Sequence, residues 1–258
     1  MPTTSITGIA EAVEQAVAKL DFERVHKEYW AQNEFVCLPQ FLSQSAMDEY
    51  LIPSAQEMKP RINRNYIPGH KKGGSVSYYT VREHAPAFLE LYRSPAFMDF
   101  VSRLVGVRLM PCPENDPHAC ALYYYTEPGD HIGFHYDTSY YKGARYTILM
   151  GLVDRSPSCR LVCQLYKDDP QRAMKELQLA TEPGTVVIFN GDKLWHAVTP
   201  LGEGEERAVL TLEYVTSQDM SPIKRLYSNL KDAFGYFGLK ALWQRKSQHS
   251  AISHQRSA

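Results

Sequence analysis

The sequence lacks the features that would direct this chain into a membrane or through a secretory pathway. It contains no run of about eighteen apolar residues, the usual minimum for a membrane-spanning helix. Its N-terminus has no basic segment followed by a hydrophobic core, so no secretory signal is visible. We therefore expect no membrane association.

Cysteine is also scarce, and basic residues are not in excess over acidic ones. The five cysteines form no Cys-x-x-Cys pair and leave an odd one, a pattern that indicates the reducing cytoplasm rather than a disulfide framework. The formal net charge is −1, whereas a nucleic-acid-binding domain carries a clustered basic field. We expect a cytoplasmic protein that acts on a small molecule and binds no nucleic acid. Nothing in the sequence indicates its oligomeric state.

The length and the hydrophobic content favour a single domain. A chain of 258 residues with 44% hydrophobic residues can bury one substantial core, and β-rich folds of this size are commonly undivided. We expect mostly helical support at residues 1–105, a β core at 106–216 and a helical segment at 217–258. The polar, glycine-containing residues 61–74 have the composition of a surface loop that acts in some proteins as a lid.

Short, closely spaced β-prone segments follow Gly106. Their spacing favours two facing antiparallel sheets over alternating helices and strands. We expect a mainly β protein with flanking helices and a cupin-like jelly-roll core, the double-stranded β-helix. The expected strands are Arg108–Met110, Ala119–Tyr125, Arg145–Val153, Arg160–Tyr166, Thr185–Phe189 and Arg207–Val215.

Three residues of this core have the spacing of a metal-binding set. His135 and Asp137 form a His-x-Asp pair, and residues two apart in a strand point the same way. His196 follows after a further strand and a turn. Two imidazoles and one carboxylate on one face of Fe(II) leave positions for a chelating co-substrate and O₂. The triplet alone is a weak motif, so its surroundings carry the inference.

Those surroundings have a recognisable order. An aromatic strand and a Pro128-Gly129 turn precede the His-x-Asp pair, a second strand and turn precede His196, and Arg207 opens another strand. As a set, residues 122–215 resemble the Fe(II)/2-oxoglutarate-dependent dioxygenase superfamily. The resemblance implies a hydroxylase that uses Fe(II), 2-oxoglutarate and O₂.

The resemblance also assigns roles. It makes His135, Asp137 and His196 the catalytic iron ligands, and Arg207 the partner of the distal carboxylate of 2-oxoglutarate. A planar guanidinium pairs bidentately with a carboxylate, which suits this role. A further co-substrate contact is expected from the strand before the turn. Counting back from the first histidine favours the face that carries Tyr124 and Thr126, although a one-residue register error would exchange the faces.

A narrower resemblance concerns residues 118–141. This segment is similar to enzymes that halogenate or hydroxylate free amino acids, notably the radical lysine chlorinases and their hydroxylase relatives. The halogenases have glycine at the carboxylate position, which leaves room for chloride. Asp137 stands there in this chain, a departure that points to hydroxylation of a small polar substrate, with a free amino acid as the first candidate.

Four further residues are candidate substrate contacts. His118, His131 and Thr138 lie near the expected metal in sequence, and Lys72 lies in the polar segment 61–74. For His131 a structural role is the simpler interpretation, and for Lys72 a solvated one.

Other functions share some of these motifs. A hydroxylase of a peptide, a carrier-bound or a lipid-like substrate would need the same triad and the same arginine. A jelly roll that binds Zn²⁺ or Mn²⁺ without 2-oxoglutarate would not need Arg207. A non-catalytic interaction module would need none of the three ligands.

Overall fold

The computed structural model describes residues 7–220, so all but the first four residues of the helical segment expected at 217–258 lie outside the described residues. The first hundred residues are largely helical. Proline and glycine set several boundaries: Pro53 lies in the first turn of α4, and Gly106, with a φ of 76°, ends α7 in the left-handed conformation. The helices are α1 (Thr7–Lys19), α2 (Phe22–Ala31), α3 (Gln44–Ala46), η1 (Met47–Leu51), α4 (Ile52–Met58), η2 (Lys59–Arg61), α5 (Tyr78–His84), α6 (Pro86–Arg93) and α7 (Pro95–Val105).

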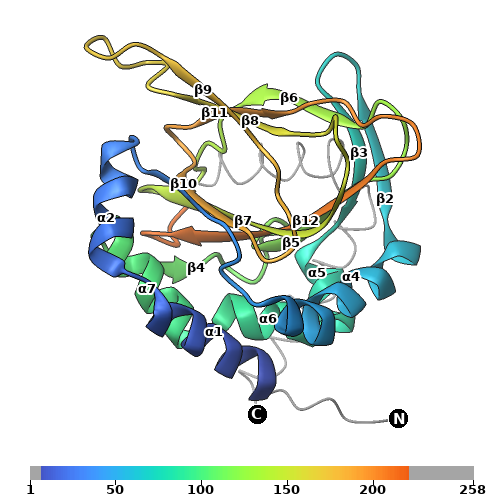
Figure 1. Cartoon of the computed structure of the whole chain (residues 1–258), viewed down its shortest axis with the longest axis horizontal. Coiled ribbons are helices and arrows are strands. Elements are labelled where there is room, and N and C mark those ends of the chain that lie inside the picture. The colour runs from blue at the N-terminus through green and yellow to red at the C-terminus, as the bar shows by residue number, and fades with distance from the viewer. Residues whose placement is uncertain (1–6, 221–258) are drawn as a thin grey trace.

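The strands form one strongly curled antiparallel sheet whose two halves face each other (Figure 1). Their order is β1-β10-β7-β12-β5-β3-β6-β11-β8-β9, with β2 paired to β3 and β4 to β12. The strands are β1 (Phe35–Leu38), β2 (Asn63–Ile67), β3 (Lys71–Val76), β4 (Met110–Pro111), β5 (Cys120–Tyr125), β6 (His131–His135), β7 (Arg145–Arg155), β8 (Leu161–Leu165), β9 (Lys175–Leu179), β10 (Val186–Asn190), β11 (Trp195–Val198) and β12 (Glu206–Val215).

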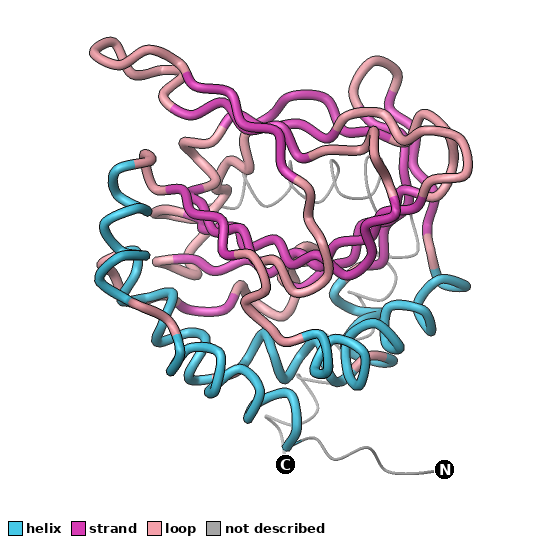
Figure 2. The backbone as a smooth tube through the Cα atoms, in the orientation of Figure 1, coloured by secondary structure: helices cyan, strands magenta, loops and turns pink. Residues whose placement is uncertain are grey.

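Strand β3 joins the two layers of this sheet. It pairs with β5 in the larger layer and with β6 in the smaller one. The helices cover the outer face of the larger layer, and the smaller layer lies across its inner face (Figure 2). The mainly β fold with a jelly-roll core and flanking helices is therefore confirmed.

Each face of the larger layer has its own hydrophobic core. Side chains that point outward pack against the helices, together with Ile9 and Val13 of α1. Those that point inward, such as Phe189 and Leu149, pack against the smaller layer. Because side chains alternate along a strand, β12 contributes to both sides. Leu210 and Leu212 are in the helical core, whereas Thr211 and Glu213 face the space between the layers.

The structure corrects the expectation for residues 61–74. They are not a free surface loop, because Asn63–Ile67 and Lys71–Val76 form the β2–β3 hairpin and β3 belongs to the sheet. The sequence signal was weak here, since lysine and glycine are poor strand formers. The six strands expected from the sequence are all present within a few residues of their expected bounds.

Two smaller expectations concern membranes and cysteines. Within residues 7–220 no helix has both the length and the apolar character needed to cross a bilayer. All five cysteines are free thiols, and Cys159 and Cys163 are fully buried, in line with a packing role.

Candidate metal centre and cavity

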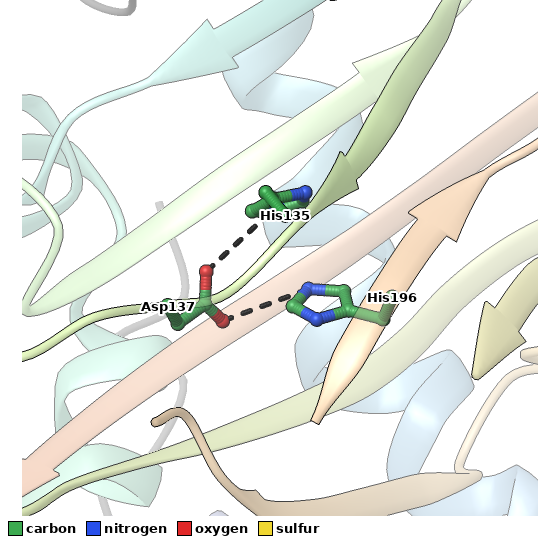
Figure 3. A group of neighbouring side chains, drawn as sticks. All are labelled: His135, Asp137 and His196. Atoms are coloured by element: carbon green, nitrogen blue, oxygen red, sulfur yellow. Dashed lines mark ion pairs between the residues drawn. The ribbon is translucent and has the colours of Figure 1, made fainter. Parts of the chain in front are cut away.

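Neighbouring strands of the smaller layer bring the three expected ligands together. His135 ends β6 and lies opposite His196 of β11 in the antiparallel register, and Asp137 follows two residues after β6. The Asp137 carboxylate faces both imidazoles: Oδ1 is 3.5 Å from Nε2 of His135, and Oδ2 is 3.7 Å from Nε2 of His196 (Figure 3). One ligand atom from each residue falls within 4.8 Å of the others, a spacing that suits a single metal ion.

Backbone carbonyls orient both imidazoles. Nδ1 of His135 lies 2.8 Å from the carbonyl oxygen of Gly133, and Nδ1 of His196 lies 3.1 Å from that of Leu194. A carbonyl only accepts, so Nδ1 donates in each ring and Nε2 is the nitrogen that faces the carboxylate. This is the arrangement that metal-binding histidines require.

The Asp137 carboxylate is held by groups from other segments of the chain. Thr147 of β7 donates its hydroxyl to Oδ2 at 2.9 Å. The loop that follows is held by Asp192, whose carboxylate accepts the N–H of Ser139 at 2.9 Å. The backbone of Asp137 also packs closely against Gly191. Only glycine fits there, because a Cβ would lie 2.6 Å from the carbonyl oxygen of Asp137.

Burial and charge shift the pKa values of Asp137 and His196 toward the forms that bind a metal. Burial and the neighbouring His135 lower the pKa of His196 to about 4. Burial alone would raise the pKa of the Asp137 carboxyl, but the adjacent imidazoles hold it well below its usual range. In this arrangement, a neutral His196 and an ionised Asp137 are available as ligands near neutral pH.

The triad opens into a cavity of about 90 Å³ between the layers, which has room for several non-hydrogen atoms rather than a single water. Arg207 lines this cavity and is 1% exposed. Its Nε donates to Thr181 at 3.0 Å and its guanidinium lies over the Tyr125 ring. Both terminal nitrogens are buried without a hydrogen-bond partner in the described part of the chain. A guanidinium in this state is costly unless an anion completes it.

A cluster of four polar side chains lies beside Asp137 on the wall of the cavity. Arg145 donates to Glu213 at 2.9 Å and lies 4.0 Å from Asp116, while Thr147 is 2.9 Å from the same Glu213 oxygen. All four side chains are buried. Burial raises the pKa of Glu213 to about 7, although Arg145 opposes the shift.

The structure corrects the face expected on β5. Tyr124 points into the helical core and donates its hydroxyl to the carbonyl of Ala55 at 2.6 Å, and Thr126 is exposed beyond the end of the strand. The cavity is lined instead by Tyr123 and Tyr125. The register was wrong by one residue.

The candidate substrate contacts divide into two pairs. His118 and Thr138 line the cavity, and Nδ1 of His118 lies 3.0 Å from the Tyr123 hydroxyl. His131 and Lys72 do not line it. They lie opposite each other on β6 and β3, where Lys72 donates to the carbonyl of Pro128 and His131 lies against that of Gly129. Their expected role in substrate binding has no support from this placement.

Several lining residues were not identified from the sequence. Thr211 and Glu213 follow Arg207 at even spacing on β12, so alternation from that arginine was the signal that could have found them. Asp116 and Arg145 also line the cavity, and Thr181 accepts a hydrogen bond from Arg207. All three are brought there by contacts between segments that are distant in the sequence, for which the sequence offers no local signal.

Comparisons with known proteins agree with this geometry at the level of fold. No family model and no curated protein matches the sequence. Among solved structures, the non-haem α-ketoglutarate-dependent epimerase SnoN from nogalamycin biosynthesis has a TM-score of 0.61 at 15% identity, covering 75% of this chain and 82% of that one. A Pseudomonas putida prolyl-4-hydroxylase has a TM-score of 0.55 at 15% identity, with coverages of 75% and 97%. A Trichoplax adhaerens prolyl hydroxylase, bound to a hypoxia-inducible-factor peptide fragment, has a TM-score of 0.59 at 16% identity, with coverages of 87% and 98%. At these identities the likeness establishes a shared fold.

Proposed function

We propose that this protein is an Fe(II)/2-oxoglutarate-dependent oxygenase that hydroxylates an unactivated C–H bond of a small polar substrate. The observation that carries the proposal is the joint placement of the triad and Arg207 on one cavity. A metal site alone would not need a buried guanidinium whose terminal nitrogens have no partner in the described chain. A dicarboxylate that chelates the metal at one end and pairs with Arg207 at the other would account for both features.

The residues present fit the cofactors on chemical grounds. Two neutral imidazole nitrogens and one carboxylate oxygen are the donor set of non-haem Fe(II) sites, and His135, His196 and Asp137 supply it. The buried, half-satisfied guanidinium of Arg207 fits the far carboxylate of 2-oxoglutarate. When bound, Fe(II), 2-oxoglutarate and O₂ supply the oxidising power for hydroxylation, with succinate and CO₂ as the other products.

The protein's own contribution is orientation and exclusion of water. Thr147 and the carbonyls of Gly133 and Leu194 hold the three ligands in fixed directions. Tyr125 and Thr181 fix the Arg207 side chain before any ligand arrives. Such preorganisation reduces the entropic cost of placing a co-substrate and a C–H bond together. Burial of the site also strengthens each charge interaction in it.

A free amino acid is the first substrate class that we propose to test. The resemblance of residues 118–141 to enzymes acting on free amino acids supports this choice, and Asp137 supports hydroxylation over halogenation. The structural neighbours include proteins named as an epimerase, a carbocyclase and prolyl hydroxylases, so product analysis is essential. The free thiols of all five cysteines suit the reducing cytoplasm that we propose as its location.

The decisive experiment is turnover by anaerobically reconstituted protein. Protein loaded with Fe(II) and 2-oxoglutarate is exposed to O₂ with each of the common amino acids in turn. Succinate is quantified, and mass spectrometry searches for a product heavier by one oxygen atom. We expect one amino acid to stimulate succinate formation with a matching hydroxylated product.

Two other results would redirect the proposal. Tight binding of Fe(II) and 2-oxoglutarate without stimulation would move the substrate to a peptide, a carrier-bound or a lipid-like molecule. Metal binding with no affinity for 2-oxoglutarate would contradict the proposal and favour a Zn²⁺ or Mn²⁺ jelly roll. Unchanged iron content in His135→Ala would favour a non-catalytic module.

A further inference from the structure

Strand β12 presents a row of side chains to the cavity whose charge changes from one end to the other. Arg207, Val209, Thr211 and Glu213 occupy alternate positions and all line the cavity. Six residues of extended chain span about 20 Å. Arg207 and Glu213 are therefore too far apart to neutralise each other, and each can receive a different group. Since the proposed function places 2-oxoglutarate at Arg207, the Glu213 end remains for the substrate.

Only one of the two carboxylate oxygens of Glu213 has hydrogen-bond partners among residues 7–220. Nε of Arg145 and the hydroxyl of Thr147 both lie 2.9 Å from Oε2. No hydrogen bond among residues 7–220 uses Oε1. The residue is 3% exposed, so water compensates its charge poorly. The raised pKa of this carboxyl has the same cause. A cation placed beside Oε1 would stabilise the ionised form.

Thr211 provides an independent sign of a polar ligand at this end. Its hydroxyl is buried and has no hydrogen-bond partner in the described part of the chain. It lies on the same face of β12 as Glu213 and lines the same cavity. A buried hydroxyl without a partner is unfavourable, so a ligand that donates a hydrogen bond to it would remove this cost.

The surrounding charges favour a cation over an anion. Arg145 is flanked by two carboxylates, Glu213 at 2.9 Å and Asp116 at 4.0 Å. The Asp116 oxygens already accept the hydroxyl of Tyr141 and the N–H of His118. Asp116 therefore contributes negative charge, whereas Glu213 offers both charge and an acceptor.

We propose that the Glu213 end of the cavity binds the ammonium group of an amine substrate, with Glu213 as the charged acceptor and Thr211 as a second acceptor. The inference rests on the proposed function and names the group by which the substrate is recognised. Thr147 contacts both Glu213 and Asp137 at 2.9 Å. An ammonium group at Oε1 therefore holds a carbon only a few bonds away close to the metal ligands, which fixes the C–H bond that reacts.

The test compares an amine with an alcohol of the same length. The full chain, loaded anaerobically with Fe(II) and 2-oxoglutarate, is titrated calorimetrically with n-butylamine and with 1-butanol. We expect butylamine to bind at least about 10-fold more tightly, since a charge-assisted hydrogen bond replaces a neutral one. Equal binding of the two compounds by the wild-type protein would overturn the inference.

Variants then show which residues cause the preference for butylamine over butanol. Glu213→Gln keeps the size of the side chain and removes its charge, so the preference for the amine should fall about 10-fold or more. Thr211→Val should weaken butylamine binding by a smaller factor. Glu176→Gln, on the exposed strand β9, is the matched control and should keep the full preference. A preference that survives in a folded Glu213→Gln protein would contradict the assignment.

The same titration separates this inference from the proposed function. 2-Oxoglutarate binding is measured on its own, and the amine titration is repeated on metal-free protein. Amine selectivity in protein that fails to bind 2-oxoglutarate supports the subsite and rejects the oxygenase. Absence of selectivity in protein that binds 2-oxoglutarate rejects the subsite alone. Thermal unfolding shows whether Glu213→Gln is folded. If it is not, the comparison of butylamine with butanol on the wild-type protein decides whether the subsite binds an ammonium group.

Discussion

The hydroxyl of Thr147 lies 2.9 Å from Oδ2 of Asp137, although the two residues belong to different layers of the fold. Thr147 is the third residue of β7, whereas Asp137 lies in irregular chain after β6. The carboxylate has no strand pairing to fix it, so this hydrogen bond positions it from across the cavity. Outer partners of this kind commonly contribute 10- to 100-fold to metal affinity, at about 1.4 kcal/mol per factor of ten.

Thr147→Val is therefore expected to weaken Fe(II) binding about 10-fold or more, because valine has the same shape but no hydroxyl. Anaerobic competition with a chelator measures the affinity without requiring turnover. Thr147→Ser retains a hydroxyl and should bind Fe(II) nearly as well as the wild type. Equal affinity of the valine and wild-type proteins would show that Asp137 is held by other groups.

Arg207→Met should separate ligand binding from stability. The guanidinium is buried, and its two terminal nitrogens have no hydrogen-bond partner among residues 7–220, so its replacement by an apolar chain should leave the ligand-free protein at least as stable. Binding of 2-oxoglutarate should weaken by about 2–5 kcal/mol. Thermal unfolding with and without 2-oxoglutarate tests both statements. Arg155→Met, at an exposed position, should still be stabilised by the ligand. Undiminished binding by Arg207→Met would remove that arginine from the co-substrate site.

Neighbouring tyrosines of β5 should respond in opposite ways. Tyr124→Phe removes a buried hydrogen bond to Ala55 and should lower the free energy of unfolding by about 1–3 kcal/mol, with 2-oxoglutarate affinity unchanged. Tyr123→Phe changes the cavity wall and should alter ligand affinity more than stability. Chemical denaturation and ligand titration of both variants measure the two effects. The reverse pattern would restore the register expected from the sequence.

The sequence predicted the triad and the sheet, but not the β5 register. His135, Asp137 and His196 are recoverable because period-two alternation and a known ligand set constrain them together. Counting back through the Pro128-Gly129 turn failed because the chain between the strands is not extended. There the Asp130 carboxylate accepts the N–H groups of residues 126 and 127, and alternation is lost across such a turn.

The buried ion pairs that Arg145 makes with Glu213 and Asp116 could not be predicted either, for a different reason. Asp116, Arg145 and Glu213 are separated by about thirty to seventy residues in the sequence, and only the pairing of β7 with β12 brings the last two together. Each of them, taken alone, is more often a surface residue. The β2–β3 hairpin was missed because its glycines and lysines match a loop, whereas in the folded protein it closes the curled sheet between β5 and β6.

Asp137→Gly tests the role of the carboxylate in the reaction. Loss of one ligand should weaken Fe(II) binding and abolish or sharply reduce hydroxylation, as measured by succinate and product analysis. A chlorinated product in chloride buffer would support kinship with the amino-acid halogenases. Undiminished hydroxylation would show that Asp137 is not a metal ligand. His131→Ala, whose ring lies against a backbone carbonyl away from the cavity, is a suitable control and should retain Fe(II) binding.

Glu213 should give the metal-free protein a distinctive dependence of stability on pH. Its pKa is raised by burial to about 7 in the folded protein, from an ordinary value of 4.5. The folded state therefore holds this proton more tightly than the unfolded state. The stability that this provides is fully present below about pH 4.5 and is lost as the pH rises through about 7. Such a shift corresponds to about 3 kcal/mol.

The variant Glu213→Gln isolates that contribution, because glutamine does not titrate. Urea unfolding in the presence of a chelator, at intervals from pH 5 to 8, gives the free energy of unfolding for both proteins. We expect the wild type to lose stability relative to the variant as the pH rises through this range. His196 contributes a change of opposite sign, since its lowered pKa costs stability as the pH falls from about 6.5 toward 4. That contribution is common to both proteins and cancels in the difference. A difference that is constant across the range would show that Glu213 ionises normally, with its charge fully compensated by Arg145.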